Sequence, residues 1–186
     1  MITKDELDNA IKSFAKTISS QQLGLAYHRP DSESLPTNCI ENVRQFITKN
    51  GGKVKYGWTF NHRISKEYGD YLFATHHAVW LAPDGYLIDI TPFHAEQKHH
   101  PIAVEGSVMF LLDDKAKPIK MGKYLIPRPL KYYPIGESKE LNEYMETLKM
   151  QEAKYYKDNF GIVLNYMKWT NLSVILIGHK NESYGR

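Results

Sequence analysis

Apolar residues that recur every three or four positions predict three amphipathic helices, each with one buried face. Thr3 followed by Glu6 fits a capping box at the start of the first helix. Asn38 is a good N-cap for the second helix, which Gly51 ends, and the third helix breaks at Gly161 before any continuation towards residue 169. The three expected helices cover residues 3–19, 38–50 and 138–160.

Runs of β-branched and aromatic residues predict strands in other parts of the chain. Pro83, Asp84 and Gly85 form a turn sequence that joins two of these strands into a hairpin. We therefore expect an α+β fold and a single domain that covers residues 1–186. The expected strands cover residues 54–60, 71–81, 86–90, 108–112, one or two stretches within 119–126, and 172–177. The segments expected to be irregular or loops are residues 21–37, 62–70 and 127–134.

The composition is that of an ordinary globular protein, with 42% hydrophobic and 24% charged residues. The net charge of +3 is small and no basic block dominates, so the charge does not indicate nucleic-acid binding. Residues 1–6 are too polar for a signal peptide, and no apolar run approaches the ~20 residues that span a bilayer. We therefore expect a soluble, cytoplasmic protein that does not bind membranes. The sequence leaves its oligomeric state open.

Cys39 is the only cysteine, which excludes an intrachain disulfide. It lies in the first turn of the second expected helix, where unpaired backbone N–H groups and the positive end of the helix dipole favour a thiolate. The same N–H groups could stabilise an oxyanion that forms during a reaction. The alternative is that Cys39 is a small buried hydrophobic residue without chemistry.

The expected hairpin places a histidine near a carboxylate. Strand alternation puts His76 and His77 on opposite faces, so only one of them can face Cys39. Asp89 stands between two isoleucines on the next strand, and a carboxylate there needs a partner because burying it unpaired is costly. A histidine on the neighbouring strand is a suitable partner. The alternative is that Asp89 only caps the turn that follows it.

Cys39, His77 and Asp89 together match the arrangement of a nucleophilic enzyme. In this interpretation the Cys39 thiolate attacks, His77 pairs with it and then protonates the leaving group, and Asp89 fixes the tautomer of His77. Such a site performs acyl transfer, either hydrolysis of an amide, isopeptide or ester, or transfer of the acyl group to an amine. The expected substrate is a peptide, a protein or a small amide, and the reaction needs no cofactor or metal.

The helix start at Cys39, the motif His-Ala-Val-Trp at 77–80 and the motif Leu-Ile-Asp-Ile-Thr-Pro at 87–92 carry a family resemblance. They resemble the core of the transglutaminase-like cysteine enzymes, which belong to the wider papain-like group. The resemblance implies an α+β fold with the nucleophile helix packed on an antiparallel sheet or small barrel. It gives the catalytic roles to Cys39, His77 and Asp89, and it favours the second histidine of the pair because alanine follows it. Members act as peptidases, amidases, deamidases and transferases, so the reaction stays open.

The resemblance covers residues 38–92, and the sequence departs from the family pattern at the oxyanion hole. Papain-like members often carry a glutamine a few residues before the nucleophile, but residues 31–38 contain none. Gln21 and Gln22 lie further upstream. Asn38 or backbone N–H groups would therefore have to stabilise the oxyanion.

Two other classes of function remain open. The protein could be a binding module that keeps the papain-like fold without catalysis. It could also bind a metal, because histidines are dense, although their spacing matches no zinc motif and the lone cysteine supplies at most one thiolate. Trp58 could line a groove that binds the acyl group of the substrate, or it could belong to the core. The histidines considered as metal ligands are His76, His77, His94, His99 and His100.

Overall fold

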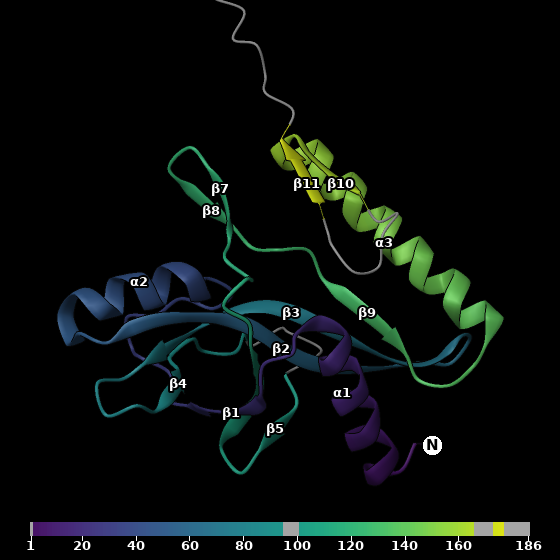
Figure 1. The fold of residues 1–186 in the computed structure, drawn as a ribbon, viewed down its shortest axis with the longest axis horizontal. Coiled ribbons are helices and arrows are strands. Elements are labelled where there is room, and N and C mark those ends of the chain that lie inside the picture. Colours follow the sequence, from purple (N-terminus) through teal and green to yellow (C-terminus); the bar gives the residue numbers. More distant parts are fainter. Residues whose placement is uncertain (1, 95–100, 166–172, 177–186) are drawn as a thin grey trace, which may run out of the picture.

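The computed structural model describes residues 2–94, 101–165 and 173–176. Within these residues the protein is α+β, with three helices and a mixed, mostly antiparallel sheet (Figure 1), which confirms the expected class. The helices are α1 (Lys4–Ile18), α2 (Cys39–Asn50) and α3 (Lys139–Phe160). The strands are β1 (Leu23–His28), β2 (Lys53–Ser65), β3 (Gly69–Leu81), β4 (Leu87–Asp89), β5 (Ala103–Val104), β6 (Ser107–Leu112), β7 (Ile119–Met121), β8 (Tyr124–Ile126), β9 (Lys131–Pro134), β10 (Ile162–Asn165) and β11 (Ser173–Leu176).

The main sheet closes on itself. β2 and β3 pair along their whole length, β3 pairs with β4, and β2 pairs with β6, all in antiparallel fashion. β1 completes the ring because it pairs in parallel with β4 and antiparallel with β6. Ala26, Val79, Val108 and Phe110 from β1, β3 and β6 form one buried cluster. The strands that carry the candidate histidines and Asp89 are therefore held in a fixed register.

The first helix forms as its sequence predicts. Thr3 Oγ1 accepts a hydrogen bond of 3.2 Å from the Glu6 amide, and the Glu6 carboxylate accepts one of 2.8 Å from the Thr3 amide. This capping box satisfies amides that the helix itself leaves unpaired. The apolar face of α1 buries Ile11 and Phe14, and the rings of Phe14 and Phe60 lie 5.6 Å apart. α1 therefore covers β2 and β3.

The second helix runs from Cys39 to Asn50 and is capped by Gly51, which also confirms the prediction. Its buried face includes Ile40 and Val43, which pack with Ala78 of β3 and with residues at the end of β4. The burial of this face fixes the start of the helix against the strands that carry the candidate histidines and Asp89.

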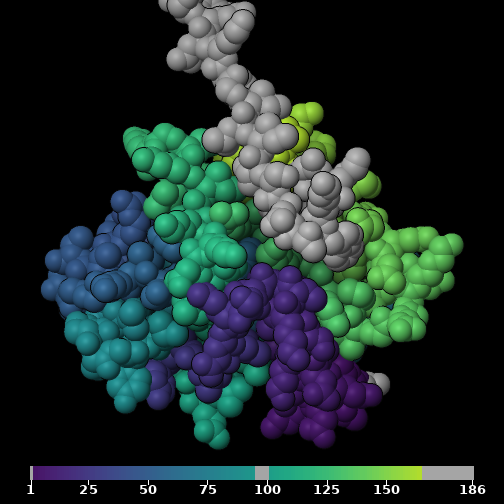
Figure 2. All heavy atoms as spheres, viewed as in Figure 1, coloured from purple at the N-terminus to yellow at the C-terminus, as the bar shows by residue number. Residues whose placement is uncertain are grey.

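The C-terminal part of the described chain forms a second layer beside the sheet. Ile126 of the β7–β8 hairpin packs with Tyr156 of α3 and Ile162 of β10. Leu141 near the start of α3 packs with Tyr71 of β3. Figure 2 shows the hairpin, in green, next to α2, in blue. α3 thus joins the hairpin to the sheet.

Three segments that we expected to be irregular contain strands. β1 lies within residues 21–37, β2 continues through the expected charged loop to Ser65, and β9 lies within residues 127–134. These segments carry glycine, proline or charged residues, and their strand conformation comes from partners that are distant in sequence. The helical pattern does not continue past Gly161, whose φ is 64°, and β10 follows it. The last expected strand is present as β11.

Candidate active site

Cys39 is the first residue of α2, and only 7% of it is exposed. The N-cap residue before it, Asn38, is exposed, and its side chain makes no capping hydrogen bond. Its backbone carbonyl accepts the amide hydrogen of Asn42 at 2.9 Å. The helix start therefore holds the thiol in place without using the Asn38 amide group.

His77 and Asp89 form a contact that is almost fully shielded from solvent. His77 Nε2 lies 3.0 Å from Asp89 Oδ2, and the two side chains are 14% and 2% exposed. The ring N–H is bent away from a linear hydrogen bond, so the interaction is mainly electrostatic when His77 is protonated. The second carboxylate oxygen, Asp89 Oδ1, accepts a hydrogen bond of 3.0 Å from the Thr91 amide. Asp89 is therefore the partner of His77 as well as a cap for the turn, so both interpretations from the sequence describe part of its contacts.

The electrostatics of His77 depend on both of the other residues. Burial by itself lowers the pKa of His77, because it disfavours the charged ring. The negative charge of Asp89, with a further contribution from Cys39, outweighs this effect and raises the pKa of His77 well above its usual value. The structure thus brings Cys39, His77 and Asp89 together.

A buried amide, Asn42, connects this site to its surroundings. Asn42 is 7% exposed, and its Nδ2 donates hydrogen bonds to Leu35 O at 2.8 Å and to Thr91 Oγ1 at 3.2 Å. Its Oδ1 accepts the Leu35 amide at 3.0 Å. Asn42 therefore joins three segments, namely the loop before α2, α2 itself and the end of the strand that carries Asp89. Sequence reasoning missed it, although a polar residue beside the apolar face of the helix was an available signal.

His76 lies on the opposite side of β3, as the alternation of the strand predicts. Its Nε2 is 2.5 Å from Ala116 O, and the residue is 2% exposed. Its ring contacts those of Tyr56 and Trp58, with centroids 6.0 and 5.5 Å away. Burial, reinforced by the nearby Arg128 and His77, lowers the pKa of His76 to about 4. His76 is therefore a neutral core residue at neutral pH.

Two further residues from the sequence analysis are engaged elsewhere. Trp58 is 2% exposed and its Nε1 donates a hydrogen bond of 3.0 Å to Asp113 Oδ2, so it belongs to the core. Gln21 and Asp114 bind each other through two hydrogen bonds of 3.0 Å. Asn38 and the backbone N–H groups at the start of α2 adjoin Cys39 and remain candidates to stabilise an oxyanion.

A groove of about 310 Å³ opens at the start of α2, between this helix and the β7–β8 hairpin. We call it the α2–hairpin groove. Asn38 and Ile40, the chain neighbours of Cys39, both line it. The other residues that line it are Glu41, Arg44, Lys123, Tyr124, Leu125 and Ile126.

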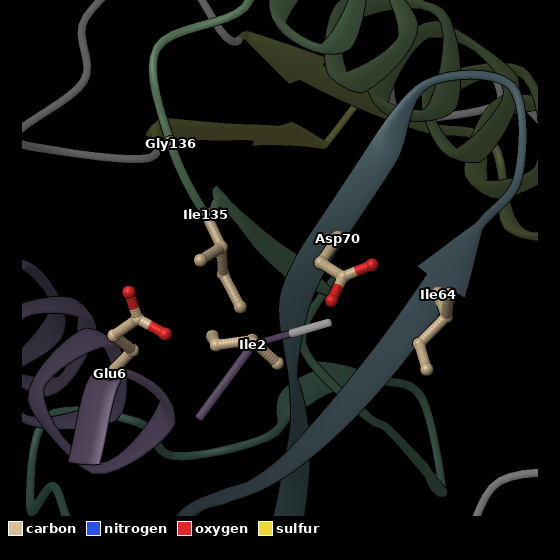
Figure 3. A pocket seen from close by; sticks show the side chains of 6 residues that line it. All are labelled: Ile2, Glu6, Ile64, Asp70, Ile135 and Gly136. Atoms are coloured by element: carbon tan, nitrogen blue, oxygen red, sulfur yellow. The ribbon is translucent and has the colours of Figure 1, made fainter. Parts of the chain in front are cut away.

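A cavity of about 650 Å³ lies away from this site, between the start of α1 and the far end of the β2–β3 hairpin (Figure 3). Its carboxylates already have partners, because Glu6 caps α1 and Asp70 lies 3.4 Å from His62. The other residues labelled there are Ile2, Ile64, Ile135 and Gly136. This cavity therefore offers no nucleophile.

The structure also bears on the metal hypothesis. Among the residues described, no three histidine, cysteine or acidic side chains are grouped so that they could hold a metal ion. His76 and His77 point to different sides of β3 and have other partners. His99 and His100 lie outside the described residues.

None of the helices that the structure describes is both long and apolar enough to cross a membrane.

No protein-family model matches the chain, and no curated protein and no solved structure shows significant similarity to it. The geometry of the site therefore carries the functional argument.

Proposed function

We propose that this protein is a thiol-dependent acyl-transfer enzyme with a papain-like, transglutaminase-like fold, in which Cys39, His77 and Asp89 form the catalytic triad. The observation that carries the proposal is the shielded contact of 3.0 Å between His77 Nε2 and Asp89 Oδ2, with Cys39 near enough to contribute to the raised pKa of the same ring. Because Nε2 faces Asp89, the other ring nitrogen, Nδ1, is left for the thiol. A thiol, an imidazole and a carboxylate in this order are the parts of an activated nucleophile.

The first half of the reaction forms a thioester. His77 holds the proton of the thiol, and the Cys39 thiolate attacks the carbonyl carbon of an amide, isopeptide or ester. A C–S bond forms and the carbonyl oxygen takes up the negative charge. When the tetrahedral intermediate collapses, the C–N or C–O bond breaks and the leaving group takes the proton from His77.

The second half releases the acyl group. Water or an amine enters, and His77 accepts a proton from it as it attacks the thioester carbon. The C–S bond then breaks and the thiolate is restored. Asp89 stabilises the imidazolium that exists between these steps and holds the ring in orientation. The raised pKa of His77 keeps this imidazolium available at neutral pH.

The start of α2 supplies donors for the oxyanion. Backbone N–H groups in the first turn of a helix have no partner within the helix, and Cys39 is the first residue of α2. The amide group of Asn38 is not used for capping and lies exposed next to the thiol. Each such donor typically contributes about 10²–10³-fold to the rate of acyl transfer.

The second candidate function is a binding module that keeps this fold without catalysis. The low exposure of Cys39, 7%, favours it, because most buried single cysteines are inert. The two functions differ in the reactivity of the thiol. A binding module tolerates Cys39→Ala and His77→Ala without loss of ligand, whereas an enzyme loses its chemistry.

The test measures the alkylation of Cys39 by iodoacetamide from about pH 5 to about pH 9, in the wild type and in His77→Ala. We expect reactivity to persist below neutral pH in the wild type and to be lost there in His77→Ala, because the imidazolium stabilises the thiolate. Mass spectrometry gives the rate directly, because Cys39 is the only cysteine.

The control variant is His62→Ala. His62 also faces a carboxylate, since its Nε2 lies 3.4 Å from Asp70 Oδ2, but it is at the far end of the β2–β3 hairpin. We expect His62→Ala to alkylate like the wild type. If Cys39 in the folded wild type reacts only in alkaline solution and ignores the loss of His77, the enzymatic proposal is wrong and the binding module takes its place.

A further inference from the structure

We propose that the α2–hairpin groove binds an acidic peptide segment of the substrate and presents the adjoining acyl group to Cys39. This inference rests on the proposed function, because it assigns the groove to the acyl donor. It adds a substrate class, which the triad alone does not define.

The first argument is position. Asn38 and Ile40 line the groove, and Cys39 stands between them in the chain. Leu125 of the hairpin lines the groove and packs against the apolar cluster that contains Cys39. A chain lying in the groove therefore reaches the helix start that carries the thiol and the oxyanion donors.

The second argument indicates a peptide. β8 lines the groove and, within the described residues, pairs only with β7. The other edge of β8 therefore presents backbone N–H and C=O groups that no described strand uses. An extended peptide can pair with such an edge, and its alternate side chains then enter the groove. The volume of about 310 Å³ suits a short segment.

The third argument is charge. Two cations, Arg44 and Lys123, line the groove against one carboxylate, Glu41. Glu41 is already engaged, because its Oε2 pairs with Arg44 Nη1 at 3.2 Å and its Oε1 accepts a hydrogen bond from Gln45. Lys123 Nζ lies 5.3 Å from the centre of the Tyr124 ring and has no carboxylate partner among the described residues. The excess of positive charge favours acidic side chains in the groove.

Arg44 also lies near the apolar cluster of the candidate site. Tyr56 packs against the cluster that contains Cys39, and the positive charge of Arg44 acts on this half-buried tyrosine. The walls are firm, because α2 is packed on the sheet and Ile126 fixes the hairpin to α3 and β10. The groove is therefore a preformed site, which lowers the entropic cost of binding.

The test uses two short peptides that end in a vinyl sulfone and differ only in two glutamates, which the second peptide replaces with glutamine. The Cys39 thiolate adds to the β-carbon of the vinyl group and the α-carbon takes a proton, so nothing leaves and both probes react alike. The measured quantity is the second-order rate of Cys39 labelling with the glutamate probe divided by that with the glutamine probe.

We expect this ratio to be about five to twenty in the wild type, since partly exposed charge pairs contribute up to about 1 kcal/mol each. Lys123→Glu should bring it to one or below. The matched control is Lys66→Glu, which makes the same charge change at an exposed position in the turn between β2 and β3 and should keep the ratio within about twofold. A wild-type ratio near one, or an equal loss of the ratio in Lys66→Glu, overturns the proposal.

A failure of the proposed function has a different signature. In that case neither probe labels Cys39 in the wild type, and iodoacetamide does not react with it below neutral pH. The groove is then tested without chemistry, by fluorescence anisotropy of the two peptides lacking the vinyl sulfone. The proposal that the groove binds an acidic peptide is supported if the glutamate peptide binds more tightly, and if this preference is lost in Lys123→Glu and kept in Lys66→Glu. Equal binding of the two peptides to the wild type refutes it.

Discussion

The buried amide of Asn42 donates a hydrogen bond of 3.2 Å to the hydroxyl of Thr91, and this contact joins the helix of Cys39 to the strand of Asp89. The amide of Thr91 in turn donates to Asp89 Oδ1 at 3.0 Å. A continuous chain of hydrogen bonds thus runs from the nucleophile helix to the carboxylate that faces His77. The hydrogen bonds that the structure describes for Asn42 and Thr91 go to other groups than the thiol, so we expect both residues to act by positioning.

Asn42→Ala tests this positioning role. The change removes three hydrogen bonds and leaves a small cavity, so we expect it to lower the free energy of unfolding by about 1–3 kcal/mol. We also expect Cys39 to be alkylated more slowly below neutral pH while His77 still titrates. Urea unfolding and iodoacetamide kinetics give the two values. Asn50→Ala, at the exposed end of the same helix, is the control and should change neither.

Asp89→Asn tests the electrostatics of His77. The carboxylate raises the pKa of His77 against the effect of burial, so its loss should lower the pKa of His77. NMR titration of the histidine rings measures this directly. Asn can still accept the Thr91 amide, so the fold should persist. An unchanged titration of His77 in this variant would show that Asp89 does not interact with the ring.

The lowered pKa of His76 predicts that the free energy of unfolding decreases in acid. Its pKa is about 4 in the fold and 6.5 as a reference, so the unfolded chain binds the proton first as the pH falls. Stability should therefore decrease between pH 6.5 and about pH 4, by on the order of 2–3 kcal/mol. Urea unfolding across this range measures the slope. His76→Gln keeps a donor for Ala116 O and should flatten it; an equal slope in the variant would contradict the assignment.

The raised pKa of Glu152 predicts the opposite pH dependence, a free energy of unfolding that decreases as the pH rises. Burial raises the pKa of Glu152 to about 7, and the backbone amide of Leu130 only partly offsets this. The folded chain thus holds a proton that the unfolded chain releases above about pH 4.5, so stability should fall as the pH rises from there towards 7. Glu152→Gln keeps an acceptor for Leu130 N and should remove this decline. The same unfolding series measures it, and a decline that survives in the variant would refute the prediction.

Gly57→Ala tests the close approach of β2 and β6. A Cβ at Gly57 would lie 2.1 Å from Leu111 O and 2.6 Å from Phe110 Cζ, so the strands would have to separate. We expect a loss of about 2–3 kcal/mol or more in the free energy of unfolding. Gly24→Ala is the matched control, because nothing lies within 4 Å of a Cβ there and β1 also pairs with β6. Equal stability of the two variants would argue against this close packing.

The candidate site was predictable where it depends on neighbours in the sequence. Cys39 starts a helix because of the residues around it, and the turn closes with a hydrogen bond of 2.9 Å from Gly85 N to Ala82 O. The alternation of a strand separates His76 from His77. The turn between β3 and β4 then places Asp89 diagonally across from His77. Each of these features depends on residues that lie near one another in the sequence.

Only the tertiary structure decided the rest. β1 and β9 carry glycine, proline and polar residues, and they are strands because β6, β4 and β3 offer them backbone partners. Asn42 reaches Thr91 across 49 positions, and the groove at the start of α2 needs a hairpin about 80 positions further along the chain. Local sequence determines caps, turns and periodicity because their energies arise between near neighbours. The strand pairings and cavities arise between distant segments, and these long-range interactions stabilise the protein only when the whole chain is folded.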